Sequence, residues 1–250
     1  MATHVFEGKA FTRSLAMIGY DKIPWNFGLV LAMTFEEGIG GDVAYDRSRC
    51  GHQMTLHNTP TWLQEASGLT VLYLDQTLPE WLDASAADTN ISLNFTTQDF
   101  SIGAWINVDD LSANRMILCR GLLDADGYHC AILMDGTIVL YTSQAAAGGQ
   151  NQSSYSAAGE IVTGIWYFVG FTRCDAVVNV YKNGLDVTNT HGIHVDPDAS
   201  ARELHIGIYD DEIGSPFAGM MWNPRVWRNV VVPDYHWQEM FELERGLFGV

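Results

Sequence analysis

Basic residues are scarce in this sequence. It contains 13 lysines and arginines against 30 aspartates and glutamates, which gives a formal net charge of −17. A surface of this charge repels phosphate groups, so we exclude nucleic acid as a partner. Such a surface attracts cations and basic partners, although acidity also serves solubility alone.

Cysteine is also sparse, and its spacing argues against one class of metal site. The four cysteines include no C-x-x-C pair, as a zinc cluster would require. Cys119 and Cys130 could meet across a hairpin. Cys130 and Cys174 also fall in or beside strand patterns, where a thiol acts as a small apolar side chain, so we expect free thiols.

Long apolar runs are missing, which bears on where the chain works. No run of about 18 apolar residues occurs, so we expect no membrane insertion. Glu7 and Lys9 interrupt the opening residues where a secretory signal would need an apolar stretch, and the Met-Ala opening suggests a natural start. We therefore expect synthesis in a cytoplasm without secretion, with an extracellular location as the alternative.

Two patterns of catalysis are absent as well. No strand carries the E-x-D-x-x-E pattern that would place two carboxylates about 5 Å apart for retaining glycoside hydrolysis, and no G-x-S-x-G elbow occurs. His191 and His194 lie beside Asp196 and Asp198, which suits either a metal site or a polar loop, and we favour the loop. The sequence therefore predicts a protein that is not an enzyme.

What is present is a set of short β-patterns, two of which follow one another within Ile165 to Gly184. Residues 176 to 181 alternate with a period of two, which indicates a strand with one buried face. Asn183–Gly184 supplies the two positive-φ positions of a type I′ turn. This stretch therefore predicts an antiparallel meander.

Further strands are expected across most of the chain. Asp135–Gly136 predicts a second hairpin, and Pro224 predicts a bulge or an edge in the last strand. Pro233 predicts the first residue of a terminal helix. The clearest single strand pattern is the unbroken alternation of Phe100, Ile102, Ala104, Ile106 and Val108. Other strand patterns begin at Leu29, Val43, Met54, Leu69, Met116 and Leu204, and the expected loops are Thr77 to Asn90, Ser143 to Gly159 and Asp186 to Ala201.

The order of these pieces resembles the LamG-like, concanavalin A-like family. GLVLAMTFEEGIGGDVAYDRSRCGHQMTL is similar to the opening strand and acidic-glycine loop of that family. DFSIGAWINVDDL, GIWYFVGFTR and VNVYKNGLDV resemble three of its later strands, and GMMWNPRVWRNVVVPDYHWQEMF resembles its closing strand and helix. The resemblance implies an all-β, antiparallel two-sheet jelly-roll sandwich over 26–250 with a short C-terminal helix. Residues 1–25 are mixed in polarity and lack a clean period, so we expect them to form an N-terminal arm.

The resemblance also implies a candidate structural Ca²⁺ at the rim of the sandwich. Its early ligand positions correspond to Glu36, Glu37 and Asp46. The late acidic pair of the family falls here on Trp222 and Asn223, which removes charge from that position. A separate acidic loop that could hold a cation in another arrangement contains Asp210, Asp211 and Glu212.

Members of this family include lectins, laminin modules, glycanases, and capsid or tail parts, so the fold leaves function open. For glycan binding, the residues that we expect in loops are Trp62, Trp81, Tyr155 and Asn151. For assembly, the apolar residues of the arm are Phe6, Phe11 and Leu15.

We predict a non-enzymatic subunit of a larger assembly, a phage or virus decoration, tail or fibre-associated protein whose loops touch host glycans. Its partners would be further copies of itself or capsid and tail proteins. The alternative is a stand-alone carbohydrate-binding module, and a polysaccharide-active enzyme ranks third.

Overall fold

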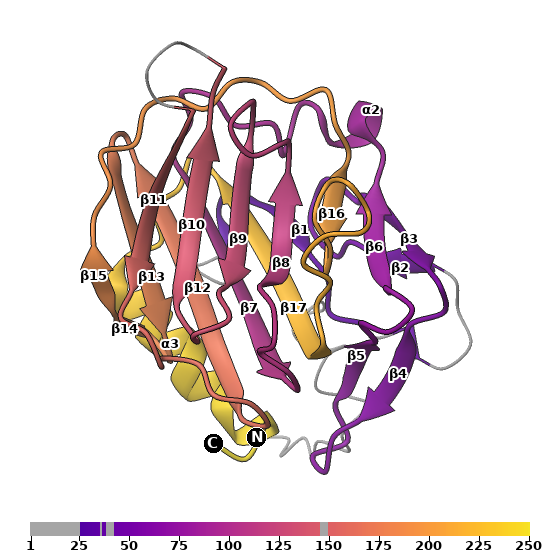
Figure 1. Cartoon of the computed structure of the whole chain (residues 1–250). Coiled ribbons are helices and arrows are strands. Elements are labelled where there is room, and N and C mark those ends of the chain that lie inside the picture. Colours follow the sequence, from indigo (N-terminus) through magenta and orange to yellow (C-terminus); the bar gives the residue numbers. More distant parts are fainter. Residues whose placement is uncertain (1–25, 36, 39–42, 146–149) are drawn as a thin grey trace, which may run out of the picture.

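Two antiparallel sheets stack face to face in the computed structural model, which describes residues 26–35, 37–38, 43–145 and 150–250 (Figure 1). The predicted sandwich is therefore confirmed. The eight-stranded sheet has the order β14-β13-β12-β7-β17-β5-β4, and β1 pairs with β17. Its strands are β1 (Leu29–Ala32), β4 (Thr61–Gln64), β5 (Thr70–Leu74), β7 (Phe100–Val108), β12 (Trp166–Cys174), β13 (Val177–Lys182), β14 (Leu185–Asp186) and β17 (Gly219–Arg228).

The nine-stranded sheet has the order β15-β11-β10-β9-β8-β16-β6-β3-β2. Its strands are β2 (Val43–Tyr45), β3 (Gln53–His57), β6 (Trp81–Ala84), β8 (Arg115–Arg120), β9 (Tyr128–Ile132), β10 (Ile138–Ser143), β11 (Asn151–Ser156), β15 (Thr188–Thr190) and β16 (Leu204–Ile206). The helical segments of the described chain are α2 (Ala86–Thr89), α3 (Asp234–Glu244) and η3 (Arg245–Leu247).

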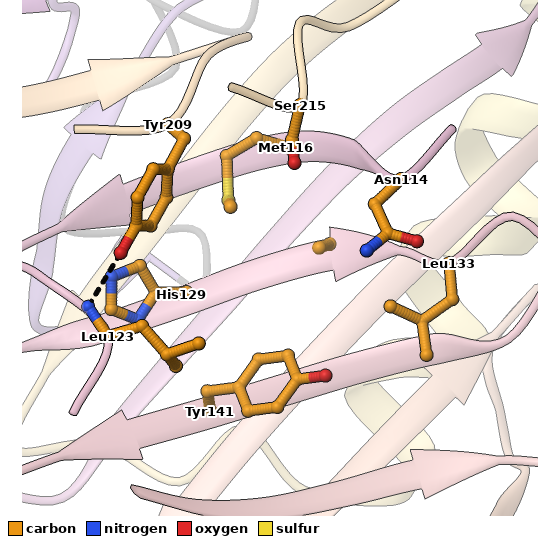
Figure 2. A pocket seen from close by; sticks show the side chains of 9 residues that line it. Asn114, Met116, Leu123, His129, Leu133, Tyr141, Tyr209 and Ser215 are labelled. Atoms are coloured by element: carbon orange, nitrogen blue, oxygen red, sulfur yellow. Dashed lines mark hydrogen bonds between the residues drawn. The ribbon is translucent and has the colours of Figure 1, made fainter. Parts of the chain in front are cut away.

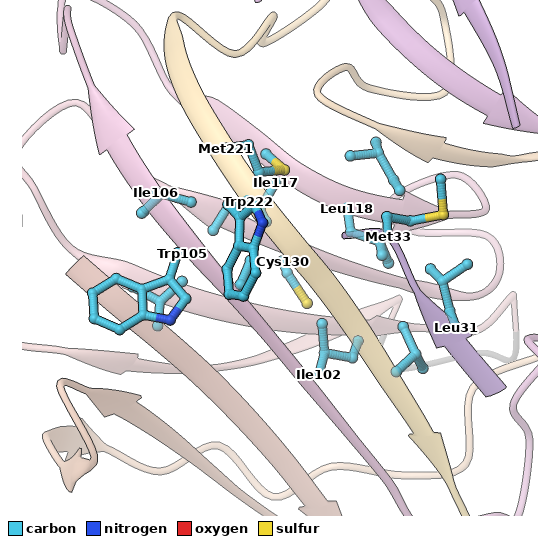
Figure 3. Packing of buried hydrophobic residues seen from close by; sticks show 14 of the residues in the cluster. Leu31, Met33, Ile102, Trp105, Ile106, Ile117, Leu118, Cys130, Met221 and Trp222 are labelled. Atoms are coloured by element: carbon cyan, nitrogen blue, oxygen red, sulfur yellow. The ribbon is translucent and has the colours of Figure 1, made fainter. Parts of the chain in front are cut away.

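Apolar side chains from both sheets fill the space between them. Ile102 and Ile106 of β7 belong to this core, as do Leu118 of β8 and Cys130 of β9 (Figure 3). The alternation that predicted β7 is confirmed, and all nine of its residues are buried. Both faces of β7 are therefore covered, one by the opposite sheet and the other by the C-terminal segment.

The C-terminal helix α3 covers the outer face of the eight-stranded sheet (Figure 1). Its Trp237 is fully buried against β7 and β12, where Gly103 and Gly170 leave room for the indole. Arg225 forms a two-pronged ion pair with Glu244, with both contacts at 2.8 Å. Trp105 Nε1 donates to the same carboxylate at 2.7 Å.

The turn predictions are confirmed. Asn183 and Gly184 have φ values of 51° and 81°, as a type I′ turn requires. Asp135–Gly136 joins β9 and β10, which pair as an antiparallel hairpin. The pairing of β17 with β7 shifts register between Trp222 and Arg225, which is the irregularity that Pro224 predicted.

The terminal helix is also present, although it begins one residue later than expected. Pro233 has an extended conformation and precedes α3 as its N-cap, so the first helical residue is Asp234. The carbonyl oxygen of Pro233 accepts hydrogen bonds from His236 N at 2.9 Å and from Trp237 N at 3.2 Å, as the carbonyl of an N-cap residue does.

Three expected loops were wrong in part. Thr77 to Asn90 contains β6 and α2, Ser143 to Gly159 contains β11, and Asp186 to Ala201 contains β15. The sequence of β11 is NQSSYS, and its serines bond to other segments. Ser156 Oγ accepts a hydrogen bond from Ile138 N at 2.9 Å, and Ser154 Oγ lies 3.0 Å from His194 Nε2.

The expected free thiols agree with the structure, in which all four cysteines lie within the described residues and are unpaired. Cys119 stands opposite His129 and Cys130 opposite Leu118, so the two thiols point to opposite faces of the sheet and cannot bond across the hairpin. No described helix is long and apolar enough to cross a membrane. The predicted arm residues Phe6, Phe11 and Leu15 lie outside the described residues.

Candidate functional site

A hollow of about 250 Å³ lies on the outer face of the nine-stranded sheet. It lies over β8, β9 and β10, beside the loop that follows β16, and Figure 2 shows the side chains around it. The helix α3 lies on the other sheet, away from this face (Figure 1). The lining residues are Asn114, Met116, Leu123, His129, Ala131, Leu133, Tyr141, Tyr209 and Ser215, which together form what we call the groove.

Strand register explains why these residues meet. His129 stands opposite Tyr141 on β10 and Ala131 opposite Val139, so their side chains leave the same face of the sheet. Met116 of β8 stands opposite Ala131. Small and flexible apolar side chains thus form the floor of the groove, and aromatic rings stand around it.

Two polar side chains are held in fixed orientations at the edge of the groove. The Tyr209 hydroxyl accepts a hydrogen bond from Leu123 N at 2.8 Å, which leaves its own proton able to donate. Asn114 Oδ1 accepts from Met134 N at 3.1 Å. This bond turns the amide nitrogen of Asn114 toward the groove (Figure 2).

His129 is a neutral imidazole in the groove wall. Burial lowers the pKa of His129 to about 4. Its Nε2 lies 2.9 Å from the carbonyl oxygen of Gly121, so Nε2 carries the proton and Nδ1 is an acceptor. Among the described residues, that Nδ1 has no hydrogen-bond partner. The ring of His129 also contacts Tyr209, with ring centroids 5.5 Å apart.

The groove is suited to holding a ligand rather than to acid–base catalysis on a glycoside. Its nine lining residues include no carboxylate, whereas glycoside hydrolysis generally uses a pair of them. An apolar floor with a few oriented polar groups is the composition typical of small-ligand sites. The groove is smaller than the usual range of about 300–1,000 Å³, so one small ring is a better fit than a long chain.

Of the four residues that we predicted to bind a glycan, only Tyr155 packs against the residues of the groove. The expectation that Trp62 and Trp81 lie in loops is wrong, because they belong to β4 and β6 and are each only 8% exposed. Trp81 stacks on His57 with ring centroids 4.5 Å apart. Tyr155 lies on β11 instead of in a loop, and packs against the apolar residues that floor the groove.

Asn151 also lies on β11, where its amide nitrogen donates to Asp124 Oδ1. The groove residues Tyr141 and Tyr209 were not singled out from the sequence. The strand pattern of β10 could have placed Tyr141 on one face of a sheet, but it does not show that α3 leaves this face uncovered.

The predicted cation ligands have protein partners. Glu37 accepts from Arg47 at 2.7 Å, and Asp210 pairs with Arg202 at 2.5 Å. Asp211 accepts backbone hydrogen bonds at 3.0 and 2.6 Å within its own loop. Glu36 lies outside the described residues.

Asp46 organises its own loop. It accepts from the backbone nitrogens of Ala32, Ser48 and His52 and from the Ser48 hydroxyl, at 2.6–3.1 Å. Four hydrogen bonds use the acceptor capacity of its carboxylate, which leaves little for a cation.

Ser92, His52 and Asp88 form a hydrogen-bonded chain that the sequence pattern did not indicate. Ser92 Oγ lies 2.7 Å from His52 Nε2, and His52 Nδ1 lies 2.9 Å from Asp88 Oδ2. The side chain of His52 is 3% exposed and that of Asp88 is 45% exposed. A catalytic triad has the reverse order, with an accessible serine and a buried aspartate. These contacts therefore connect the residue before β3 to α2 and to the segment after α2.

The segment from His191 to Asp198 also serves packing. His194 is buried and its Nδ1 lies 2.7 Å from Thr142 Oγ1. Asp196 pairs with the buried Arg173 at 2.7 Å, and Asp198 Oδ2 accepts from a backbone nitrogen at 2.7 Å. The polar-loop interpretation of this segment agrees with these contacts.

A comparison with family profiles identifies the fold. A sequence profile described as the concanavalin A-like lectin/glucanases superfamily matches residues 83–234, more than half of the chain. No curated protein sequence matches the chain.

Solved structures of toxin binding domains are similar to this chain. The botulinum neurotoxin serotype G binding domain aligns with a TM-score of 0.64 and 12% identity, over 86% of this chain and 51% of that one. The binding domain of botulinum neurotoxin DC, solved with rat synaptotagmin II, gives 0.65 and 12%, over 87% and 52%. Botulinum neurotoxin type C, described as depending on two ganglioside molecules for cell entry, gives 0.63 and 12%, over 88% and 52%. This chain therefore spans about half the length of these structures.

Proposed function

Because the chain belongs to the concanavalin A-like lectin/glucanases superfamily, we propose that it is a non-catalytic binding protein that holds a glycan in the groove. The observation that carries this proposal is the groove itself, a hollow of aromatic, apolar and oriented polar side chains on the face that α3 leaves uncovered. The ganglioside dependence described for botulinum neurotoxin type C supports a glycan as the ligand class.

The chemistry of the groove matches one face of a sugar ring. Tyr141 and Tyr209 offer flat apolar surface, against which the C–H face of a pyranose can pack. The Tyr209 hydroxyl and the Asn114 amide offer donors to hydroxyls at the edge of the ring. Since the protein carries a net charge of −17, we propose a neutral glycan rather than an acidic one, so the ganglioside dependence of the type C toxin supports the ligand class and not its charge.

Glycan-array binding by the full-length chain tests this proposal. We expect neutral glycans to bind and Tyr141→Ala to weaken that binding at least tenfold. Tyr235→Ala is the matched control, because this tyrosine is 60% exposed on α3, on the other sheet. Equal binding by both variants, or binding to no neutral glycan, would contradict the proposal.

Display on a phage or virus particle is our proposal for the setting. It is supported by the acidic composition and by the apolar arm residues Phe6, Phe11 and Leu15. The arm would bury these side chains on a neighbouring subunit, and the groove would face outward. Light scattering on the full-length chain and on a chain that lacks residues 1–22 tests it. If the full-length chain is an oligomer and the truncated chain a monomer, the result supports assembly through the arm. An unchanged number of subunits would reject it.

A further inference from the structure

We propose that Glu203, His205 and Glu212 bind a divalent transition-metal ion of the Zn²⁺ class. Their candidate ligand atoms all lie within 4.8 Å of one another. His205 comes from the middle of β16 and Glu203 from the residue before that strand, whereas Glu212 lies in the loop that follows. Among the described residues, this is the one group of three or more such side chains at metal-binding separation.

His205 is the observation that points to a ligand. Its side chain is only 3% exposed, and both of its ring nitrogens lack a hydrogen-bond partner within the described chain. The carboxylate oxygen Glu212 Oε1 lies 3.9 Å from Nε2, which is too long for a hydrogen bond. A buried polar group without a partner is costly, so an imidazole in this state calls for an explanation.

The neighbouring strands do not supply the missing partner. His205 stands opposite Asp83 on β6 and opposite Cys119 on β8. The carboxylate of Asp83 lies 2.5 Å from His57 Nε2, and the thiol of Cys119 donates to Ile208 O at 3.4 Å. The imidazole is therefore fixed in the sheet beside Glu212, and none of these described groups bonds to it.

The donor set selects the kind of ion. One imidazole nitrogen with two carboxylates suits Zn²⁺, Co²⁺ or Mn²⁺, whereas Ca²⁺ and Mg²⁺ prefer oxygen ligands alone. Ligand atoms around a tetrahedral Zn²⁺ lie roughly 3.4 Å apart, given metal–ligand distances of about 2.0–2.2 Å. Glu212 is exposed and Glu203 partly exposed, so both side chains can rotate to close the remaining gap. Three protein ligands leave one position for water.

The same ion would fix the loop that borders the groove. Glu212 N donates to Tyr209 O at 2.9 Å, and Tyr209 N donates to Gly214 O at 3.0 Å, so Glu212 and the groove residue Tyr209 share one turn. An ion on Glu212 and His205 would hold this turn against β16. This consequence for ligand affinity rests on the proposed function, whereas metal binding itself does not.

Titration of the metal-free full-length chain with Co²⁺ and with Zn²⁺ tests the site. We expect one equivalent to bind, with Co²⁺ absorption bands of a nitrogen–oxygen site and without the thiolate charge-transfer bands that the exposed Cys50 and Cys174 would give. Glu212→Gln and His205→Asn each remove a direct ligand, so each should weaken binding by at least the roughly 10- to 100-fold that loss of an outer-shell partner costs. Glu242→Gln on the exposed side of α3 is the control and should bind like the parent chain.

Three results would overturn the proposal: no stoichiometric binding, thiolate bands in the Co²⁺ spectrum, or equal affinities in Glu212→Gln and Glu242→Gln. Because Glu212 is exposed, we expect Glu212→Gln to fold, so metal affinity can be compared with the parent chain even if the variant of the buried His205 does not fold. Metal binding without glycan binding would leave the site intact and reject only the proposed function. Glycan binding that is unchanged by removal of the ion would reject only the consequence for the loop.

Discussion

The outer faces of the two sheets differ in whether the chain covers them. The chain covers the eight-stranded sheet with its own helix α3 and buries Trp237 there completely. On the nine-stranded sheet it leaves Tyr141 and Tyr209 around a hollow. Covering a face adds apolar burial and stabilises the fold, whereas an open aromatic face keeps surface available for a ligand. The comparison therefore separates residues that hold the fold from residues that bind.

The largest expected effect comes from breaking the buried ion pair under α3. Glu244→Ala leaves Arg225 buried without its carboxylate and Trp105 Nε1 without its acceptor. We expect a loss of about 3–5 kcal/mol in the free energy of unfolding, measured by urea denaturation. Glu242→Ala, two residues away and exposed, should cost less than about 0.5 kcal/mol. Similar losses in both variants would show that the ion pair does not hold this face.

Low pH should lower the free energy of unfolding through two buried histidines, one within the nine-stranded sheet and one packed against it. Burial lowers the pKa of both His129 and His194 to about 4. Between about pH 6.5 and 4 the unfolded chain binds these protons and the folded chain does not, so this stability is full above about pH 6.5 and falls as the pH drops toward 4. The loss is on the order of 3 kcal/mol for each histidine.

Urea denaturation at several pH values checks this effect. His194→Asn should flatten the dependence of stability on pH between about 6.5 and 4. Replacement of the half-buried His236 on α3 should leave it as steep as in the parent chain. Equal slopes for the parent chain and His194→Asn would contradict the account.

A smaller change under α3 tests the fit of Trp237. In Gly170→Ala the new Cβ would lie 2.8–3.0 Å from three atoms of the indole ring, which is packed between strands and helix. We expect about 1–3 kcal/mol of destabilisation. Gly246→Ala adds a methyl where nothing in the described chain lies within 4 Å, and should be close to neutral in the same urea experiment. A neutral Gly170→Ala would mean that the helix packs more loosely than described.

The smallest effect on stability is expected in the groove. Tyr141→Ala removes a partly exposed ring from the open face, and should change the free energy of unfolding by less than about 1 kcal/mol. The same change should weaken glycan binding at least tenfold, so affinity and stability would separate. A loss of several kcal/mol in urea denaturation would assign Tyr141 to the fold instead.

The strands that alternate clearly could be predicted from the sequence. β7 and the β12–β13 meander follow period-two patterns, and Asn183–Gly184 marks the next turn by its tolerance of positive φ. By contrast, β11 was expected as loop, because its serines and asparagine give no apolar period. Ser154 of this strand contacts His194, which lies forty residues later, and a local pattern does not show such a contact.

The groove could not be predicted for a similar reason. Tyr141 and Tyr209 meet only because β16 lies beside β8 in the sheet and carries its following loop toward β9 and β10. Which outer face α3 covers depends on the room that Gly103 and Gly170 leave for Trp237, which is a tertiary fit. Trp62 and Trp81 were predicted to bind a glycan from their residue type alone, but they lie in β4 and β6 and are buried there.

One measurement tests most directly the claim that the open face binds. Amide chemical shifts of the isotope-labelled full-length chain would be followed while a neutral glycan is titrated. We expect shifts to concentrate at His129, Tyr141 and Tyr209, with α3 unaffected. Shifts centred on α3, or no shifts with any neutral glycan, would contradict the account and show that the groove is not the binding site.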